Sequence, residues 1–373
     1  MEGLKPTTRR RLLKVSGSTA IAAVAASGLA KPAIAQGMPE VKWRLTASWP
    51  KSLDTLYGAC EHISKRVAEM TDNKFQIQPF AAGEIVPGLQ VLDAVQAGTV
   101  DCGHTALYYY FGKDDAFVFG SALPFGMNPR IQNAWLLHGG GQQLLNEFLK
   151  SYNCHFVPAG NTNCQMGGWF RKQVKTVDDL KGLKFRLGGF AGRIMQRLGV
   201  VPQQIAGGDI YPALENGTID GAEWVGPYDD DKLGFVKVAR FYHYPGWWEP
   251  SSTGGFIANI EKFNALPKIY QEILTAAVLE TNNWTAAKYD AVNPAALKRL
   301  VSQGAVLTPF SAEVMDACHT AAYDLYKEIN ARNPWFKKLY DSQKAFMDDG
   351  YLWTQVADYT MDTYMIRYRN AGK

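Results

Sequence analysis

Apolar and polar positions along the chain form a pattern that predicts alternating strands and helices. Val41–Ala47 alternates as a strand does, and apolar residues recur at helical spacing over Leu56–Met70. We predict a second strand over Lys74–Phe80, a short helix over Gly88–Ala97 and a buried strand over Val100–His104. Strands that alternate with helices in this way are typical of an α/β domain.

The same order of elements returns further along the chain. Strands are predicted over Phe156–Ala159 and Leu183–Leu187, followed by a helix over Phe190–Leu198. Tyr211–Trp224 is again a helix, a glycine turn and a strand, and its sequence resembles that of Val91–His104. This repetition predicts two similar α/β lobes. A ligand is expected between them, where strand ends and helix N-termini converge.

From Ile269 onward the pattern is almost entirely helical. Ser311 is predicted to cap a helix, and residues 348–350 (Asp-Asp-Gly) to break the chain before a last amphipathic helix over Tyr351–Tyr368. The apolar side chains of that last helix either pack on their own chain or form a contact with a second copy. The pattern does not separate these two alternatives.

The N-terminal segment has the pattern of an export signal. Residues 8–14 contain consecutive arginines ahead of a mildly apolar stretch, residues 15–30, which is shorter and weaker than the roughly 20 apolar residues of a membrane span. Residues 33–35 (Ala-Ile-Ala) supply the small residues that signal peptidase recognises. We therefore predict a twin-arginine signal peptide over residues 1–35, export to the periplasm, and a mature chain that begins at Gln36.

Charge excludes several classes of partner. Residues 1–35 hold six of the 39 Lys/Arg residues and one of the 35 acids, so the formal charge falls from +4 for the whole chain to −1 after cleavage. A chain so balanced has no field that favours nucleic acid or an anionic membrane surface. The rest of the sequence has no long apolar run, so we expect a soluble mature protein.

The cysteines show no CxxC spacing, which argues against zinc, haem attachment or a thioredoxin-like site. Twin-arginine cargo usually folds before export in a reducing compartment, so buried free thiols are expected, although the count also allows one disulfide. The five are Cys60, Cys102, Cys154, Cys164 and Cys318.

Catalytic motifs are absent from the sequence, which has no GxSxG, HExxH, P-loop or GxGxxG pattern and no histidines at ligand spacing. We therefore expect a binding protein with no organic cofactor, not an enzyme. Arg186–Gly192 is a glycine-rich turn from a strand to a helix. It is either a plain tight turn with a surface arginine, or a site for one anionic group that faces both free helix N–H groups and the fork of Arg186.

Several motifs resemble a known family. Thr176–Arg186, Leu198–Pro202 and Ile210–Trp224 look like the core signature of the extracytoplasmic solute receptors of TRAP (tripartite ATP-independent periplasmic) transporters. Ala81–Glu84 and Gly98–Asp101 match earlier motifs of that family, so the resemblance covers essentially the whole mature chain. It implies a two-lobed α/β fold like that of periplasmic binding proteins, with a central cleft and a helical C-terminal region that ends in a long helix.

Three more motifs resemble the branch of this family that binds 2-oxo monocarboxylates such as pyruvate: Gln165–Trp169, Gly221–Trp224 and Tyr244–Glu249. The resemblance implies that Arg186 grips the carboxylate of the acid, which the receptor delivers to the membrane subunits of a TRAP transporter. It also implies a homodimer tied by the C-terminal helix. A bound cation, sodium with calcium as the alternative, is expected to bridge the acid to Gln165, Glu223, the backbone carbonyl of Trp224, and Glu249.

Electrostatics agree with a bridging cation. At a few ångströms and an effective dielectric near 20, Glu223 and Glu249 would each repel an anionic ligand by about 4 kcal/mol, and a cation reverses that sign. Ligands that are all oxygen suit sodium or calcium and do not suit zinc. Each acid alone would also fit a solvated loop position. The occurrence of both acids together with Arg186 at strand ends favours a binding site.

The expected ligand is a short 2-oxo acid. Two alternatives stay open: a receptor of the same family for another carboxylate, such as lactate or an acidic sugar, and an enzyme exported by the twin-arginine route. The residues expected to bind the acid are Arg186, Gln165, Trp224, Glu223 and Tyr109. The aromatic residues expected to shape a small, closed, largely apolar pocket are Tyr108, Tyr109, Tyr110, Phe111, Trp169 and Trp224.

Domain boundaries follow from these predicted elements. The first lobe is predicted to comprise residues 36–160 together with about 250–285, and the second lobe about 161–249. A helical region over about 286–373 is expected to pack on both lobes and on a dimer partner.

Overall fold

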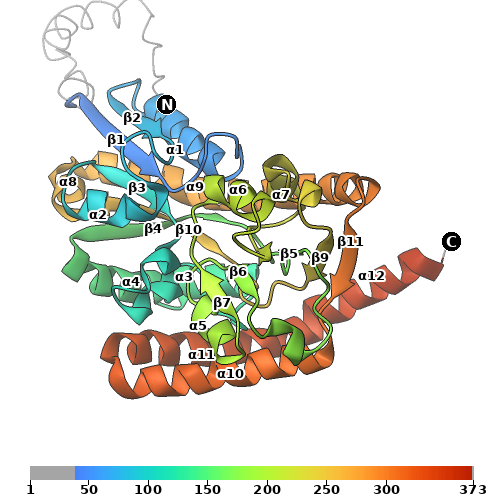
Figure 1. The fold of residues 1–373 in the computed structure, drawn as a ribbon. Helices are drawn as coiled ribbons and strands as arrows, with labels where there is room; N and C mark the ends of the chain where they lie inside the picture. The colour runs from blue at the N-terminus through green and yellow to red at the C-terminus, as the bar shows by residue number, and fades with distance from the viewer. Residues whose placement is uncertain (1–37, 372–373) are drawn as a thin grey trace, which may run out of the picture. The chain divides into compact units, whose positions relative to one another are not determined.

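The strands of the protein form two separate sheets (Figure 1). The computed structural model describes residues 38–371. The chain divides into two units, and both sheets belong to the second, Val41–Lys373. The first unit, Met1–Glu40, lies almost entirely outside the described residues, and the predicted signal peptide lies wholly outside them. This division does not test the predicted lobe boundaries, which stay a prediction.

The first sheet is mixed, with the strand order β2-β1-β3-β10-β4. β1 pairs in parallel with β2 and β3, whereas β10 is antiparallel to β3 and β4. Strand β10 therefore returns from far along the sequence to pair between β3 and β4. The strands are β1 (Val41–Ala47), β2 (Phe75–Phe80), β3 (Cys102–Thr105), β4 (Cys154–Asn161) and β10 (Thr253–Asn259).

The second sheet is also mixed, with the order β11-β9-β5-β8-β6-β7. β6 is parallel to β7 and β8, while β5 is antiparallel to β8 and β9. Its strands are short, and only β6 and β8 lie in segments where the sequence pattern predicted a strand. They are β5 (Trp169–Phe170), β6 (Lys184–Arg186), β7 (Val201–Gln203), β8 (Gly221–Ala222), β9 (Phe241–Tyr244) and β11 (Val306–Pro309).

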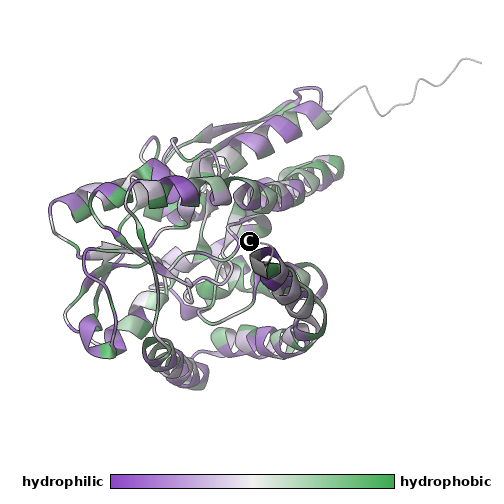
Figure 2. Ribbon diagram, turned by 90° about the vertical axis from the view of Figure 1, so that its right-hand side faces the viewer, coloured by the Kyte–Doolittle hydropathy of each residue, from purple (hydrophilic) through white to green (hydrophobic). Residues whose placement is uncertain are grey.

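Helices pack against both sheets, and their apolar and polar residues alternate along the outer helices in Figure 2. The predicted helix over Gly88–Ala97 begins with a 3-10 turn and continues as α2. No described helix is long and apolar enough to cross a membrane. The first eight are α1 (Leu56–Met70), α2 (Val91–Gln96), α3 (Pro129–His138), α4 (Gly141–Leu149), α5 (Ala191–Arg197), α6 (Ile210–Glu215), α7 (Pro227–Leu233) and α8 (Ile260–Ala265).

The 35-residue helix α9 (Lys268–Ser302) contacts a strand of the first sheet and a helix that follows β8 of the second sheet. It packs on β4 of the first sheet, where the Asn282 side-chain oxygen accepts a hydrogen bond from the Gly160 N–H at 3.1 Å. It also packs on α7, where the Asn293 side-chain oxygen accepts one from the Tyr228 N–H at 3.1 Å. One helix thus makes specific polar contacts to two separate parts of the fold.

The C-terminal region is helical, as predicted, and Ser311 caps α10 (Ala312–Arg332) by accepting a hydrogen bond from the Val314 N–H. The predicted break at residues 348–350 is wrong, because α11 (Pro334–Thr354) runs straight through them. A side chain on Gly350 would come within 2.7 Å of Ile131, so this glycine serves close helix packing.

The chain continues beyond α11 without a loop. A π-helical turn (Gln355–Tyr359) leads into α12 (Thr360–Ala371). Large apolar side chains are exposed along this last part of the described chain, among them Trp353, Val356, Tyr359 and Tyr364. Within this chain they therefore do not form a buried core.

Candidate functional site

A small cavity is lined by residues that follow strands of both sheets. Tyr108 and Tyr109 come after β3 of the first sheet, and Arg186 and Trp224 come from the ends of β6 and β8 of the second. The cavity holds about 340 Å³ of empty space, its mouth included. Because this volume includes open space at the mouth, it is an upper bound, and the cavity has room for a small molecule at most.

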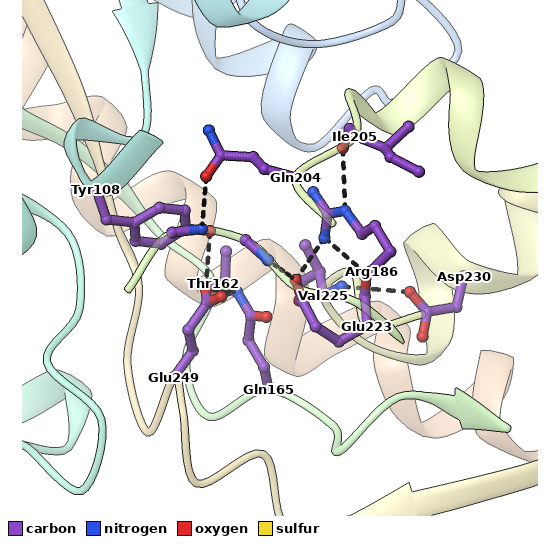
Figure 3. A network of polar contacts seen from close by, with 12 residues as sticks. Tyr108, Thr162, Gln165, Arg186, Gln204, Ile205, Glu223, Val225, Asp230 and Glu249 are labelled. Carbon is purple, nitrogen blue, oxygen red and sulfur yellow. Dashed lines mark hydrogen bonds and ion pairs between the residues drawn. The ribbon is translucent and has the colours of Figure 1, made fainter. Parts of the chain in front are cut away.

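Arg186 is almost completely buried, at 1% exposure, and its guanidinium is held on one side only. Nε donates to the Ile205 carbonyl at 3.0 Å, and Nη1 donates to the carbonyl of Glu223 at 2.7 Å and to its carboxylate (Figure 3). Nη2 is buried without a partner. Burial lowers the pKa of Arg186, but Glu223, Tyr109, Tyr108 and Glu249 together raise it above its usual value, so the cation is retained.

Two N–H groups of the glycine-rich turn after Arg186 are used within the protein. The Gly188 N–H donates to the Glu223 carboxylate, and the Gly189 N–H donates to the side-chain oxygen of Gln204 at 3.2 Å. The alternative of a plain turn with a surface arginine is wrong, because Arg186 is buried and lines the cavity. An anion site at Arg186 stays a prediction.

Glu249 and Gln165 form the other polar group of the site (Figure 3). The Gln165 amide donates to Glu249 Oε2 at 2.6 Å and to the Thr162 hydroxyl at 3.1 Å, and the Tyr108 hydroxyl donates to the same Glu249 oxygen at 3.1 Å. Gln165 Oε1, Glu249 Oε1 and Glu223 Oε2 are buried and have no hydrogen-bond partner. Three oxygen acceptors thus lie unpaired in one region of the protein.

The two acids influence each other. Burial raises the pKa of Glu249 well above its usual range, and the nearby charge of Glu223 raises it further. Burial also raises the pKa of Glu223, against the opposing effects of the Arg186 charge and the Gly188 N–H. Burial thus favours the neutral form of Glu249. When both carboxylates are ionised, the single arginine leaves one negative charge in excess, which a bound cation would neutralise.

A cation with oxygen ligands fits the donors that these residues offer. The unpaired atoms of Gln165, Glu223 and Glu249 are all oxygens, and hard ions such as sodium and calcium prefer oxygen. No group of three or more His, Cys, Asp or Glu residues suited to a metal occurs among residues 38–371. The predicted set contains only two acids, with an amide and a carbonyl as the other ligands.

The structure separates the predicted pocket aromatics into two groups. Tyr108, Tyr109 and Trp224 line the cavity. Trp169 does not: it is fully buried, stacks on Tyr242 at 4.0 Å and donates to Asp230 at 2.9 Å. The prediction for Trp169 is wrong, because its indole packs on Tyr242 and donates to Asp230 inside the protein core.

Two further aromatics were also misplaced. Tyr110 packs in the core of the first sheet, where its hydroxyl accepts a hydrogen bond from the Leu92 N–H at 3.1 Å. Phe111 lines a different hollow, beside α5 and β7. In a run of consecutive aromatics each side chain points a different way, and the sequence does not say which one faces the ligand.

Sequence reasoning missed several residues of the cavity. Trp49 and Leu56 line it from the segment after β1, and Ser252 and Thr253 line it at the start of β10. Trp49 lies just beyond the carboxyl end of a predicted strand, which is where ligand sites in α/β folds occur, so that rule could have found it. No pattern in the sequence indicated Ser252 or Thr253.

The thiols are free, as expected. None of the five cysteines forms a disulfide. Four of them are buried, and burial raises their pKa, so they behave as small apolar side chains. Cys164, next to Gln165, is exposed.

Comparison with known proteins identifies the class of protein. The family model of bacterial extracellular solute-binding proteins, family 7, matches residues 46–333. The chain therefore belongs to this family of extracytoplasmic receptors. Family membership also sets aside the alternative of an exported enzyme.

Three similar proteins narrow the class. The chain is 51% identical over 328 residues to a monocarboxylate 2-oxoacid-binding periplasmic protein of Nostoc sp. (strain PCC 7120), covering 88% of this chain and 90% of that one. It is 47% identical, with a TM-score of 0.89, to a TRAP transporter solute-binding protein of Bordetella bronchiseptica RB50 that copurified with calcium and picolinate; 90% of this chain and 100% of that one are covered.

A third protein, a TRAP solute-binding protein of Pseudoalteromonas atlantica T6c, was solved with bound sodium and pyruvate. It is 37% identical, with a TM-score of 0.84, over 86% of this chain and 98% of that one. The expected likeness to TRAP receptors is confirmed. The expected α/β fold with a helical C-terminal region is confirmed with it.

Proposed function

We propose that this TRAP receptor binds a short 2-oxo monocarboxylate such as pyruvate together with a cation, sodium or calcium, and delivers the acid to the membrane subunits of its transporter. The names of its relatives support this ligand class: the Nostoc protein binds 2-oxo acids, and the Pseudoalteromonas structure holds sodium and pyruvate. Export by the twin-arginine signal over residues 1–35 belongs to the same proposal.

One observation carries the proposal: the site leaves three buried acceptors and two buried donors unpaired, the donors being Nη2 of Arg186 and the indole N–H of Trp224. An unsatisfied buried polar atom costs about 1–3 kcal/mol, so five in one site call for a ligand. A cation takes the free oxygens of Gln165, Glu223 and Glu249, with the Trp224 carbonyl as a further ligand. The carboxylate of the acid takes Nη2 of Arg186.

The chemistry of the two ligands found in relatives is consistent with this arrangement. Pyruvate and picolinate each carry a carboxylate next to a second donor atom, a keto oxygen in one and a ring nitrogen in the other. Such a pair of atoms can chelate a cation. We therefore expect the 2-oxo group to be recognised through the metal, and Tyr109 and Trp224 to contact the acid from the wall of the cavity.

Binding is expected to hold the two lobes together, since the proposed ligand atoms follow strands of both sheets. Tyr108 comes from the first sheet, and Arg186 from the second. The closed form is then the one that docks on the transporter. The exposed apolar side chains of α12 support a homodimer formed through the C-terminal helix.

A thermal-shift titration of metal-stripped protein tests this function, because a ligand that binds only the folded state raises its melting temperature. We expect pyruvate to raise it in the presence of sodium or calcium and to have little effect without either. Propionate, which lacks the 2-oxo group, is the matched control and should give no shift. No shift with pyruvate under any of these conditions would refute the ligand class and the cation site together.

A further inference from the structure

A series of four aromatic rings lies between Glu249 and Arg186, two charged residues of the site. The Tyr108 hydroxyl donates a hydrogen bond to Glu249, and the Tyr108 ring lies 5.0 Å from the Tyr109 ring. The Trp49 ring lies 6.2 Å from that of Tyr109. The Trp49 ring lies 6.3 Å from that of Trp224. Arg186 stacks over Trp224 at 5.0 Å. Trp49 is thus the middle of a series that runs Glu249, Tyr108, Tyr109, Trp49, Trp224, Arg186.

Trp49 is held in place by a buried histidine. Its indole Nε1 donates to Nδ1 of His104 at 2.6 Å, and Nε2 of His104 faces the Ala159 carbonyl at 3.3 Å. Because Nδ1 accepts, the proton of the neutral ring is on Nε2. Burial lowers the pKa of His104 to about 4, so this arrangement persists at neutral pH. The indole is therefore a fixed wall.

The two tryptophans of the cavity differ in what they offer a ligand. The indole N–H of Trp224 is buried without a partner, so it is free to donate. The indole N–H of Trp49 is already used by His104, so Trp49 presents only carbon atoms to the cavity. Leu56 and Ala106, which also line the cavity, are apolar as well. This part of the wall suits the hydrocarbon tail of an acid and gives no polar group to bind.

We infer that Trp49, positioned by His104, limits the length of the tail of the acid that the receptor accepts. The inference rests on the proposed function, because it assumes that the carboxylate lies at Arg186 and the cation at Gln165, Glu223 and Glu249. With the head group fixed there, the tail points toward a rigid indole. A methyl group fits in front of it, and a longer, branched tail meets its ring. Trp49 is a specificity residue, and His104 is a positioning residue that acts through it.

The test compares two acids with the same head group in the full-length mature protein with sodium present. Calorimetric titration gives the affinities for pyruvate and for 4-methyl-2-oxopentanoate. In Trp49→Leu we expect the affinity for the longer acid, relative to pyruvate, to rise about tenfold or more. A single methylene group in an apolar pocket discriminates to this extent, and the two acids differ by three carbon atoms. Trp43→Leu is the matched control.

Trp43 lies in β1, the strand that precedes Trp49, and is buried, but it packs on Phe75 at 5.2 Å and does not line the cavity. Its replacement should reduce stability without changing the ratio of the two affinities. A similar change of ratio in Trp43→Leu and Trp49→Leu would mean that loosening the lobe, and not the wall, sets the tail length, and would overturn the inference.

The role of His104 is tested by the same ratio. Asparagine can accept the indole hydrogen bond through its side-chain oxygen, whereas leucine cannot. We therefore expect His104→Leu to relax the selectivity toward that of Trp49→Leu, and His104→Asn to keep most of it. If both variants keep the wild-type ratio, His104 does not position the indole.

Different results would refute the inference about Trp49 and the proposed function. If the wild-type protein binds pyruvate and Trp49→Leu leaves the ratio unchanged, the inference is wrong while the proposed function stands. If the wild-type protein binds neither acid with sodium or calcium, the proposed function fails and the inference fails with it.

Discussion

Two pairs of buried acids, Asp229 with Asp230 and Glu223 with Glu249, differ in how fully their carboxylate oxygens are hydrogen-bonded. Asp229 and Asp230 of α7 have all four carboxylate oxygens hydrogen-bonded: Thr55 and Tyr289 donate to Asp229, and Val225, Trp169 and Tyr242 donate to Asp230. Glu223 and Glu249 each keep one buried oxygen without a partner. All four residues are at most 2% exposed, so burial does not distinguish the pairs.

The difference shows which feature marks a binding site. The aspartates complete hydrogen bonds between α7 and its neighbours, and they need nothing from outside the protein. The glutamates are held in place through one oxygen and leave the other available, which is the arrangement a ligand requires. Unpaired oxygens, and not buried charge as such, therefore identify the candidate site.

The largest expected effect comes from Glu249→Gln. Glutamine can still accept the hydrogen bonds from Gln165 and Tyr108, but it removes the negative charge that the cation needs. We expect the cation-dependent affinity for pyruvate to fall by about 100-fold or more, which corresponds to about 2.7 kcal/mol, measured by calorimetric titration.

The free energy of unfolding of the ligand-free variant should not decrease. The ligand-free Glu249→Gln protein is expected to be at least as stable as the wild type, because an incompletely paired buried charge is removed. An undiminished, sodium-dependent affinity in this variant would contradict the cation site.

Asp230→Asn should give the reverse result and is the matched control. Trp169, Tyr242 and the Val225 N–H all donate to Asp230, and an asparagine offers only one oxygen to these three donors. Leaving a donor unpaired should lower the free energy of unfolding by about 1–3 kcal/mol, measured by urea titration. Pyruvate affinity at a temperature where the variant is folded should change by no more than a few-fold; a larger loss would mean that the aspartates belong to the site.

The most gradual expected effect is on the pH dependence of stability. Burial raises the pKa of Asp229 from 3.8 to about 6, against the hydrogen bonds from Thr55 and Tyr289. Between these values the folded protein holds a proton that the unfolded chain has released. The contribution is therefore fully present below about pH 4 and is lost as the pH rises through 6.

This contribution is on the order of 3 kcal/mol at most. Melting temperatures from pH 4 to 7 should fall less steeply with rising pH in Asp229→Asn than in the wild type. Identical slopes would show that Asp229 is ionised throughout this range in both states.

Periodic segments of the first sheet could be predicted well from the sequence. The bounds of β1 and α1 agree with the predicted Val41–Ala47 and Leu56–Met70, because each repeats its apolar positions over a long run. The short strands β5 and β9 could not be predicted in this way. Two to four residues carry no measurable period, and they are set by pairing with partners distant in the sequence.

The site required more than local pattern. Arg186, Gln165, Glu223 and Glu249 lie together, as the family motifs implied, but nothing in their spacing alone indicated it; their roles in binding stay a prediction. Context decided the remaining cases. Gly350 lies within a helix because it faces Ile131 from a distant part of the chain, and no local rule distinguishes that role from a break.

Helix α9 restricts how the protein can move. At 1.5 Å per residue a 35-residue helix is about 50 Å long. Asn282 ties it to β4 and Asn293 ties it to the start of α7, so two points along one helix are fixed to different parts of the fold. Pro294 lies directly after the second of these points and removes one helical hydrogen bond there. We therefore expect any motion that admits the ligand to bend the helix near Pro294 and to keep both contacts.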